Sequence, residues 1–142
     1  MKTIAIVATG GTIAGTWKKG KTSAYHAGEI DIDSIIETIP EINEVAHIKE
    51  YQLMNIDSNE MTHEKWLILK NNIEEILSDD TIDGAVVTHG TDTLDETAYF
   101  LTLTLNTPKP VVLTGAMRPA TATSADGPFN LYQAVCLACH GE

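Results

Sequence analysis

The sequence has few basic residues, and this shortage excludes two classes of partner. Nine Lys and Arg residues stand against 20 Asp and Glu residues, which gives a formal net charge of -11. Nucleic acids and anionic membrane surfaces are bound by clusters of basic side chains, so we expect neither as a partner. A small molecule is the better candidate for a ligand.

Long hydrophobic runs are also missing. No apolar stretch approaches the roughly 20 residues that cross a bilayer, and the chain enters a strand-like run at once, without the hydrophobic region of a signal peptide. We therefore expect a cytoplasmic protein. With 142 residues, 43% of them hydrophobic, the chain is long enough for one core and is expected to form a single domain over residues 1–142.

Only two cysteines are present, and residues 136–140 have the C-x-x-C-H spacing of c-type haem attachment. Covalent haem needs an exported protein and a second axial ligand, which the sequence does not indicate. We favour the alternative in which Cys136 and Cys139 lie with Val135 on the buried face of a terminal helix and act as small hydrophobic residues. We expect no disulfide, metal or other cofactor.

Strand-like and helix-like segments alternate along the chain. Apolar runs of strand length occur at residues 3–8, 45–53, 84–88 and 111–115. Helical patterns follow them: Ile32 to Ile39, a helix capped by Thr62 with an apolar stripe to Leu77, a helix through Ala98 to Leu105, and a last one that starts at Asp126 to Pro128. This succession predicts an α/β fold, a flavodoxin-like open parallel sheet with helices on both faces.

Polar residues gather where the first three strands end. Thr12 follows the first strand, Ser58 and Asn59 follow the second, and Thr91 and Asp92 follow the third. The carboxyl ends of parallel strands meet at one edge of the sheet, and in the flavodoxin-like order the first and third strands flank the ligand crevice. We therefore expect Thr12 to lie close to Thr91 and Asp92, with Ser58 entering from the second strand.

Helix capping is the simpler alternative for the third of these loops. Thr93 and Glu96 have capping-box spacing, and a hydrogen bond from a helix amide to Asp92 or Thr93 would stabilise the helix by about 1 kcal/mol. One cap satisfies that need, so the surplus of polar side chains favours a ligand site. His89 is expected to be a buried histidine with satisfied hydrogen bonds rather than a base.

Residues 15–28 form a polar, glycine-flanked segment that is a candidate lid carrying Tyr25. Threonine and serine hydroxyls, a carboxylate and this tyrosine together suggest acyl transfer, in which a hydroxyl attacks an amide with the help of a base and an oxyanion donor. The glycine loop at residues 9–15 lacks the lysine of a phosphate loop, so nucleotide binding is less well supported.

Two stretches, Thr9-Gly10-Gly11-Thr12-Ile13-Ala14-Gly15 and Val87-Thr88-His89-Gly90-Thr91-Asp92-Thr93, resemble the signature motifs of the bacterial-type L-asparaginases (asparaginase/glutaminase family). Residues 114–119 and 124–131 follow the family pattern in the same order. The resemblance implies hydrolysis of L-asparagine to L-aspartate and ammonia through a threonine acyl-enzyme.

The same resemblance implies roles for single residues. Thr12 would be the nucleophile, activated by Tyr25, and Thr91 and Asp92 would form a second catalytic set with a lysine. Ser58 would bind the substrate α-carboxylate, and Asp92 its α-ammonium group. Asn59 stands where the family more often has glutamine or glutamate at the α-amino group, so a preference for asparagine over L-glutamine does not follow.

The family forms homotetramers in which a carboxyl-terminal domain follows a longer amino-terminal domain. The resemblance thus implies that this chain is a truncated amino-terminal part, impaired alone. The lysine and the carboxyl-terminal domain would lie outside it, and a separate carboxyl-terminal fragment is one candidate source for them. The alternative is a flavodoxin-like module that binds an acidic amino acid without turning it over.

Overall fold

The protein is described here by a computed structural model, which covers residues 1–17, 25, 26 and 28–141. Its centre is a parallel sheet of four strands, which are β1 (Thr3–Gly10), β4 (His47–Ile56), β5 (Gly84–Thr88) and β6 (Val111–Thr114). The strands lie in the order β4-β1-β5-β6, so the second strand of the sheet in chain order lies outside the first. This order confirms the predicted flavodoxin-like sheet.

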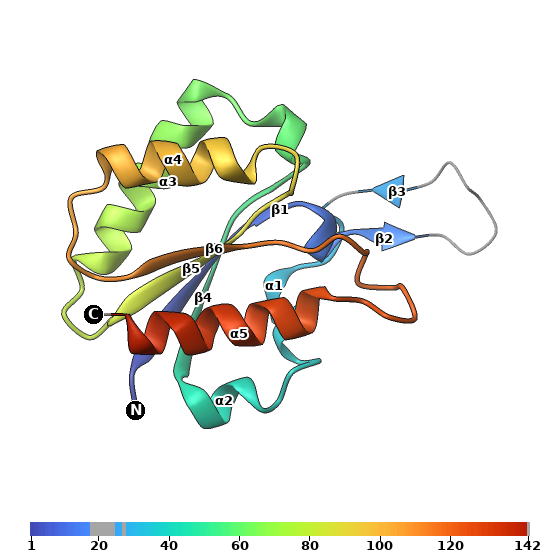
Figure 1. Ribbon diagram of the computed structural model, residues 1–142, viewed down its shortest axis with the longest axis horizontal. Coiled ribbons are helices and arrows are strands. Elements are labelled where there is room, and N and C mark those ends of the chain that lie inside the picture. The colour runs from blue at the N-terminus through green and yellow to red at the C-terminus, as the bar shows by residue number, and fades with distance from the viewer. Residues whose placement is uncertain (18–24, 27, 142) are drawn as a thin grey trace.

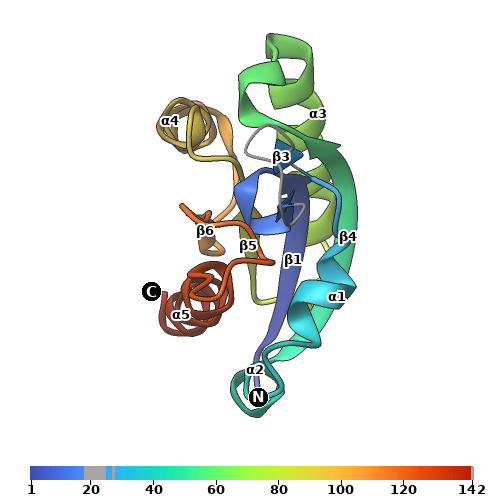
Figure 2. The same cartoon turned by 90° about the vertical axis from the view of Figure 1, so that its right-hand side faces the viewer.

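Helices cover both faces of the sheet, as predicted (Figures 1 and 2). One face is covered by α1 (Ile32–Ile36), α2 (Ile42–Val45) and α5 (Gly127–His140), and the other by α3 (His63–Leu77) and α4 (Leu94–Thr104). Side chains of a strand alternate between faces. Ile4 and Ile6 of β1 therefore join the core under α5, while Ala5 and Val7 join the core under α3.

Two of the strands that lead into the site, β1 and β4, are longer than predicted. β1 continues past Ala8 to Gly10, and β4 begins at His47 and runs to Ile56, beyond the predicted end at Leu53. The reason is mutual pairing, because the β1–β4 ladder extends from Thr3 opposite His47 to Gly10 opposite Ile56.

The predicted helices are found at the expected places in the chain, but some of their ends differ from the prediction. The Thr62 side chain accepts a hydrogen bond from the Lys65 amide at the start of α3, as expected. Regular helix in α1 ends at Ile36 rather than Ile39, with the Thr38 hydroxyl donating to the Ile35 carbonyl. Such a local side-chain bond competes with helical pairing. The short α2 was not anticipated.

The two cysteines lie on α5 as free, half-buried thiols. The fully buried positions of this helix belong instead to Ala134, Val135 and Ala138, so the expected burial of the cysteines was only partly right. Burial, followed by the neighbouring Cys136 thiol, raises the pKa of Cys139. The residues that the model describes contain no group of three or more His, Cys, Asp or Glu side chains arranged for a metal.

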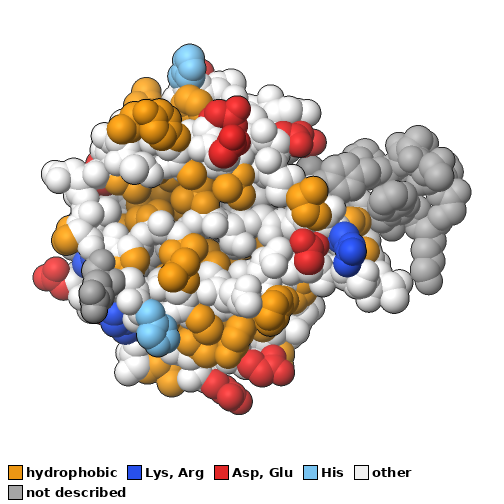
Figure 3. All heavy atoms as spheres, in the orientation of Figure 1, with side chains coloured by type: hydrophobic (Ala, Val, Ile, Leu, Met, Phe, Trp, Pro, Cys, Tyr) orange, Lys and Arg blue, Asp and Glu red, His pale blue; other side chains and the backbone are white. Residues whose placement is uncertain are grey.

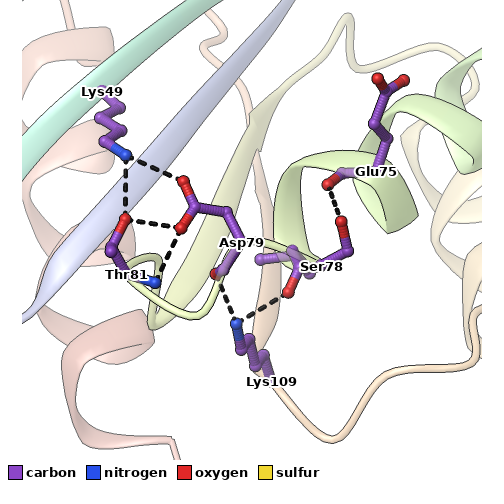
Figure 4. Close-up of polar contacts among 7 residues, drawn as sticks. Lys49, Glu75, Ser78, Asp79, Thr81 and Lys109 are labelled. Carbon is purple, nitrogen blue, oxygen red and sulfur yellow. Dashed lines mark hydrogen bonds and ion pairs between the residues drawn. The ribbon is translucent and has the colours of Figure 1, made fainter.

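A polar cluster closes the end of the sheet away from the polar loops (Figure 4). Asp79 accepts from the Thr81 hydroxyl at 2.7 Å, the Thr81 amide and the Lys49 ammonium, which together hold its pKa at about 2. The Lys109 ammonium donates to the carbonyls of Leu77 and Asp79, at the carboxyl end of α3. A cation there satisfies carbonyls that the helix leaves unpaired.

The small ribbon beside the sheet contains β2 (Thr16–Trp17) and β3 (Tyr25–His26), which pair in antiparallel fashion. The rest of the expected lid, residues 18–24 and 27, lies outside the described residues, and so does the side chain of Tyr25. None of the helices in the described part of the chain is long and apolar enough to cross a membrane.

Candidate active site

Three loops meet by close contact of their backbones at the carboxyl edge of the sheet. Gly11 follows β1 and lies against Gly90, which follows β5, so that a Cβ on Gly11 would be 2.4 Å from the Gly90 nitrogen. A Cβ on Gly90 would in turn be 2.6 Å from the Ser58 Oγ in the loop after β4. Only glycine permits these approaches. The loops expected to share a crevice are therefore in contact.

Ser58 joins two of the loops through its hydroxyl and its carbonyl. It opens a short 3-10 helix, Ser58–Glu60, that is capped by Asp57, and its side chain is buried. The Ser58 Oγ accepts from the Asp92 amide at 3.2 Å, and the Ser58 carbonyl accepts from the Thr93 hydroxyl at 2.8 Å. Ser58 is thus held beside Asp92, as expected, and the adjacent Asn59 is exposed.

The capping explanation of the third loop is wrong for Thr93. This residue does occupy the N-cap position of α4, but its side chain makes no capping hydrogen bond, because its hydroxyl is used to hold Ser58. The reciprocal bond to Glu96 that defines a capping box is therefore not formed. Asp95 and Glu96 instead place negative charge in the first turn, where the helix dipole favours it.

Thr12 begins the short 3-10 helix Thr12–Ala14 directly after Gly11 and is half-buried. Thr91 and Asp92 are exposed on the loop that Gly11 touches. Thr9 has a different use, since its buried hydroxyl donates to the Thr88 carbonyl at 2.8 Å and joins β1 to β5. Of the hydroxyls in the first motif, Thr12 is the one placed at the rim of the loop junction.

His89 is a buried core histidine, as predicted. Its Nδ1 is 2.7 Å from the Gly90 carbonyl and its Nε2 is 2.9 Å from the Thr97 hydroxyl, which also accepts from the Trp66 indole. One neutral tautomer satisfies the whole chain of bonds, with Nδ1 donating and Nε2 accepting. Burial lowers the pKa of His89 despite the bond to Gly90, so the ring is neutral and holds the loop in place.

A fourth loop, after β6, was not recognised as part of this arrangement. The Asp126 carboxylate accepts from the amides of Met117 and Arg118, each at 2.9 Å, and from the Asn130 side chain. Burial raises the pKa of Asp126, but these hydrogen bonds outweigh it and the pKa lies below its usual value. The sequence predicts Asp126 at the start of α5 and within the family-like stretch 124–131, but it does not predict that its carboxylate binds the amides of this loop.

This fourth loop touches both the third loop and Gly15, the residue directly before β2. A Cβ on Gly115 would lie 2.6 Å from the His89 carbonyl and 3.3 Å from the Thr91 Cγ2. The Ala120 amide donates to the Gly15 carbonyl at 3.1 Å. The edge of the sheet thus carries hydroxyls at Thr12, Ser58 and Thr91 and a carboxylate at Asp92, a set that suits an amino acid with opposite charges at one end.

Four lysines make their polar contacts away from the loop junction. Lys65 donates to the Glu60 carbonyl, Lys70 pairs with Glu74, and Lys49 and Lys109 belong to the cluster around Asp79 (Figure 4). A groove of about 450 Å³ between β4 and α3, lined by Tyr51, Asn72 and Glu75 among others, is also remote from the loop junction. We place the site at the junction, because the polar loops converge there.

A parallel sheet whose polar loops form a hydroxyl and carboxylate site at its carboxyl edge defines the class as an α/β small-molecule enzyme or binding protein. Residues 3–142 match the family model described as "Asparaginase, N-terminal". The chain belongs to this family.

Several proteins of similar sequence or structure are named L-asparaginases. The chain is 54% identical over 135 residues to a probable periplasmic L-asparaginase of Haemophilus influenzae and 51% identical over 136 residues to L-asparaginase 2 of Bacillus subtilis. It covers 38% and 36% of their lengths, while 95% of the chain is matched in each. The crystal structure of a probable cytoplasmic L-asparaginase from Campylobacter jejuni superposes with a TM-score of 0.93 at 53% identity, covering 99% of the chain and 43% of that protein.

Proposed function

We propose that this chain carries the amino-terminal part of an L-asparaginase active site, which hydrolyses the side-chain amide of L-asparagine to L-aspartate and ammonia. The observation that carries the proposal is the contact of Gly11 with Gly90 and of Gly90 with Ser58. It brings Thr12, Thr91 and Asp92 to one edge of the sheet, and relatives of more than 50% identity are named L-asparaginases.

In the proposed reaction the Thr12 hydroxyl attacks the amide carbon. Its proton passes to a base, the C–N bond breaks, and ammonia leaves after accepting a proton. The resulting ester on Thr12 is then hydrolysed by water, which returns the hydroxyl and releases L-aspartate. We assign Tyr25 to the activation of Thr12, and Thr91 with Asp92 to a second set that a lysine from outside these 142 residues completes.

Substrate binding in this proposal uses groups whose chemistry matches a zwitterion. The Ser58 hydroxyl accepts from the Asp92 amide and keeps its own proton for the substrate α-carboxylate. The exposed Asp92 carboxylate, with Asn59 nearby, receives the α-ammonium group. A charge-assisted bond of this kind is worth more than one between neutral groups.

The test begins with L-aspartate binding to the 142-residue chain, measured by calorimetric titration. Asp92→Ala is expected to abolish binding. Asp95→Ala removes another exposed carboxylate three residues further on, in the first turn of α4, and is expected to leave the affinity unchanged. Equal affinity in both variants would return Asp92 to a purely structural role.

Turnover separates the enzyme from the alternative, a module that only binds an acidic amino acid. Little or no ammonia is expected from the chain alone, because the loss of a positioned base costs roughly 10²–10⁴ in rate. Ammonia release should appear when the carboxyl-terminal remainder of a family member is supplied, and Thr12→Ala should remove it while binding persists. Binding without ammonia in that complex would identify a sensor. The same assay with L-glutamine measures the substrate preference.

We also propose a cytoplasmic location and a homotetramer for the complete protein. The name of the Campylobacter jejuni protein supports the location, whereas the Haemophilus influenzae relative is named as periplasmic. Cell fractionation and light scattering on the complete protein are the respective tests.

A further inference from the structure

The two thiols of the chain lie three residues apart on one helix. Cys136 and Cys139 belong to the carboxyl-terminal part of α5, and both are free and half-buried. Residues at this spacing in an α-helix are neighbours on one face, with Cβ atoms about 5–6 Å apart. Figure 3 shows α5 at the surface of the molecule, with hydrophobic side chains gathered along it. The spacing that resembles haem attachment thus places two sulfur atoms side by side on a helix surface.

The surroundings of the pair argue against a reactive thiolate. Burial raises the pKa of Cys139, and the neighbouring Cys136 thiol raises it further. The Tyr132 hydroxyl, one helical turn earlier, is hydrogen-bonded to the Cys136 thiol. A nucleophilic or redox-sensing cysteine needs a lowered pKa. Coordination of a metal ion has no such need, because the ion itself displaces the thiol proton. The charged side chains that act on this face are Lys2, Glu41, Glu44 and Asp83.

Two sulfur ligands without a third restrict the kind of ion. In the described part of the chain, no group of three or more His, Cys, Asp or Glu side chains could hold a metal. Zinc takes three or four protein ligands, and Mg²⁺ and Ca²⁺ prefer oxygen. Thiolates select soft ions such as Cu(I), which is satisfied by two sulfur atoms in line. With metal–sulfur bonds of about 2.3 Å, the two sulfur atoms would be about 4.6 Å apart, which Cβ atoms at this spacing allow.

We propose that Cys136 and Cys139 form a two-coordinate site for a soft cation of the cuprous type, held between their sulfur atoms. One Cu⁺ and two S–H groups give an S–Cu–S complex with a single negative charge and two released protons, and no electron is transferred. The inference goes beyond the proposed hydrolysis. It departs from the sequence-based expectation of no metal, because the model leaves both thiols free on one face of α5.

The first test measures Cu(I) binding to the 142-residue chain without oxygen, in competition with a coloured Cu(I) chelator. One ion should bind per chain, and a pH-stat at pH 6 should record two protons per ion. Cys136→Ser and Cys139→Ser should each weaken binding by at least about 100-fold, because the second thiolate of a linked pair binds at a high effective concentration. Excess Zn²⁺ should not displace the ion.

Matched variants test the spacing of the thiols rather than their number. Cys139→Ser combined with Leu137→Cys keeps two cysteines, but these are adjacent and point about 100° apart around the helix. Leu137 is 60% exposed, so the site tolerates the change. This variant should bind as weakly as Cys139→Ser alone. Cys139→Ser combined with Gln133→Cys restores the three-residue spacing at an exposed position and should restore binding.

His140→Ala tests for a third ligand. The His140 Nδ1 lies 2.8 Å from the Cys136 carbonyl, so this nitrogen is engaged with the backbone and the affinity should not change. Circular dichroism of each metal-free variant checks that the fold is intact.

Three results would overturn the proposal. The first is equal affinity in the variant with adjacent thiols, and the second is a loss in His140→Ala as large as in the serine variants. The third is a dimer in which one ion joins two chains, which light scattering would detect. None of these measurements involves ammonia or L-aspartate, so their outcome is independent of the proposed function.

Discussion

Replacement of Gly11 by alanine tests whether the site depends on close contact between backbones. Gly11 has φ 82° and ψ -171°, a region that essentially only glycine occupies, and an L-residue there costs about 1–3 kcal/mol. The new Cβ would also lie 2.4 Å from the nitrogen and 2.5 Å from the Cα of Gly90. These atoms belong to the backbone and cannot rotate away, so overpacking adds about 1–3 kcal/mol. Gly11→Ala should therefore lower the free energy of unfolding by about 2–6 kcal/mol.

A second variant separates the two contributions. Gly90 has no positive φ, and its added Cβ would meet the Ser58 side chain at 2.6 Å, so Gly90→Ala should cost only the packing contribution, about 1–3 kcal/mol. Adding Ser58→Gly removes the side-chain atoms that the new methyl group at position 90 would strike, and a double-mutant cycle should show recovery. The same addition to Gly11→Ala should recover nothing. Urea denaturation measures the three single variants, including Ser58→Gly alone, and the two double variants. A loss below about 1 kcal/mol for Gly11→Ala would refute this account of the junction.

The remaining predictions concern side chains that hold the loops. The pKa of His89 lies below its unfolded value of about 6.5, so the stability that comes from the neutral ring is complete above that value and is lost as the pH falls from it through the lower folded pKa. His89→Gln should be less stable at pH 7.5 but should lose less on transfer to pH 5.5, as urea denaturation at both pH values will show. Thr93→Val should lose about 1 kcal/mol with the bond to the Ser58 carbonyl, whereas Thr93→Ser should lose less, and equal losses would contradict the bond's importance. Asp126→Asn should destabilise the fourth loop by about 1–2 kcal/mol and speed amide exchange at Met117 and Arg118, because one of the two accepting oxygens becomes an NH2 group and the other accepts more weakly than a carboxylate oxygen. Unchanged exchange at both amides would argue against this role.

The sheet was predictable because its signals are local. Continuous apolar runs such as residues 84–88 have the composition of strands buried on both faces, and β5 has the predicted bounds. The end of β4 was not predictable in the same way. Ile56 favours a strand but Asn55 does not, and β4 stays extended to this point because Gly10 of β1 pairs with Ile56. Strand length was decided by the neighbouring strand, which a single local window does not contain.

The loops of the site were predictable as a group, and their contacts were not. The strand order alone places Thr12, Ser58 and Thr91 at one edge, since they follow neighbouring parallel strands. The sequence does not reveal that the Thr93 hydroxyl bonds to the Ser58 carbonyl rather than to a helix amide. Either bond would pair the Thr93 hydroxyl with one backbone group. Which of the two forms depends on how the loops that carry Ser58 and Thr93 lie relative to each other.

The end of β6 positions the loop that carries Thr91. The Thr114 carbonyl accepts from the His89 amide, and Gly115 packs against the His89 carbonyl and the Thr91 methyl group. The Asn130 side chain of α5 donates to the Gly115 carbonyl and fixes this turn from the other face. These three contacts hold the turn after β6 against the backbone that precedes Thr91. The position of the Thr91 loop therefore depends on residues of β6 and α5 that lie far from it in the sequence.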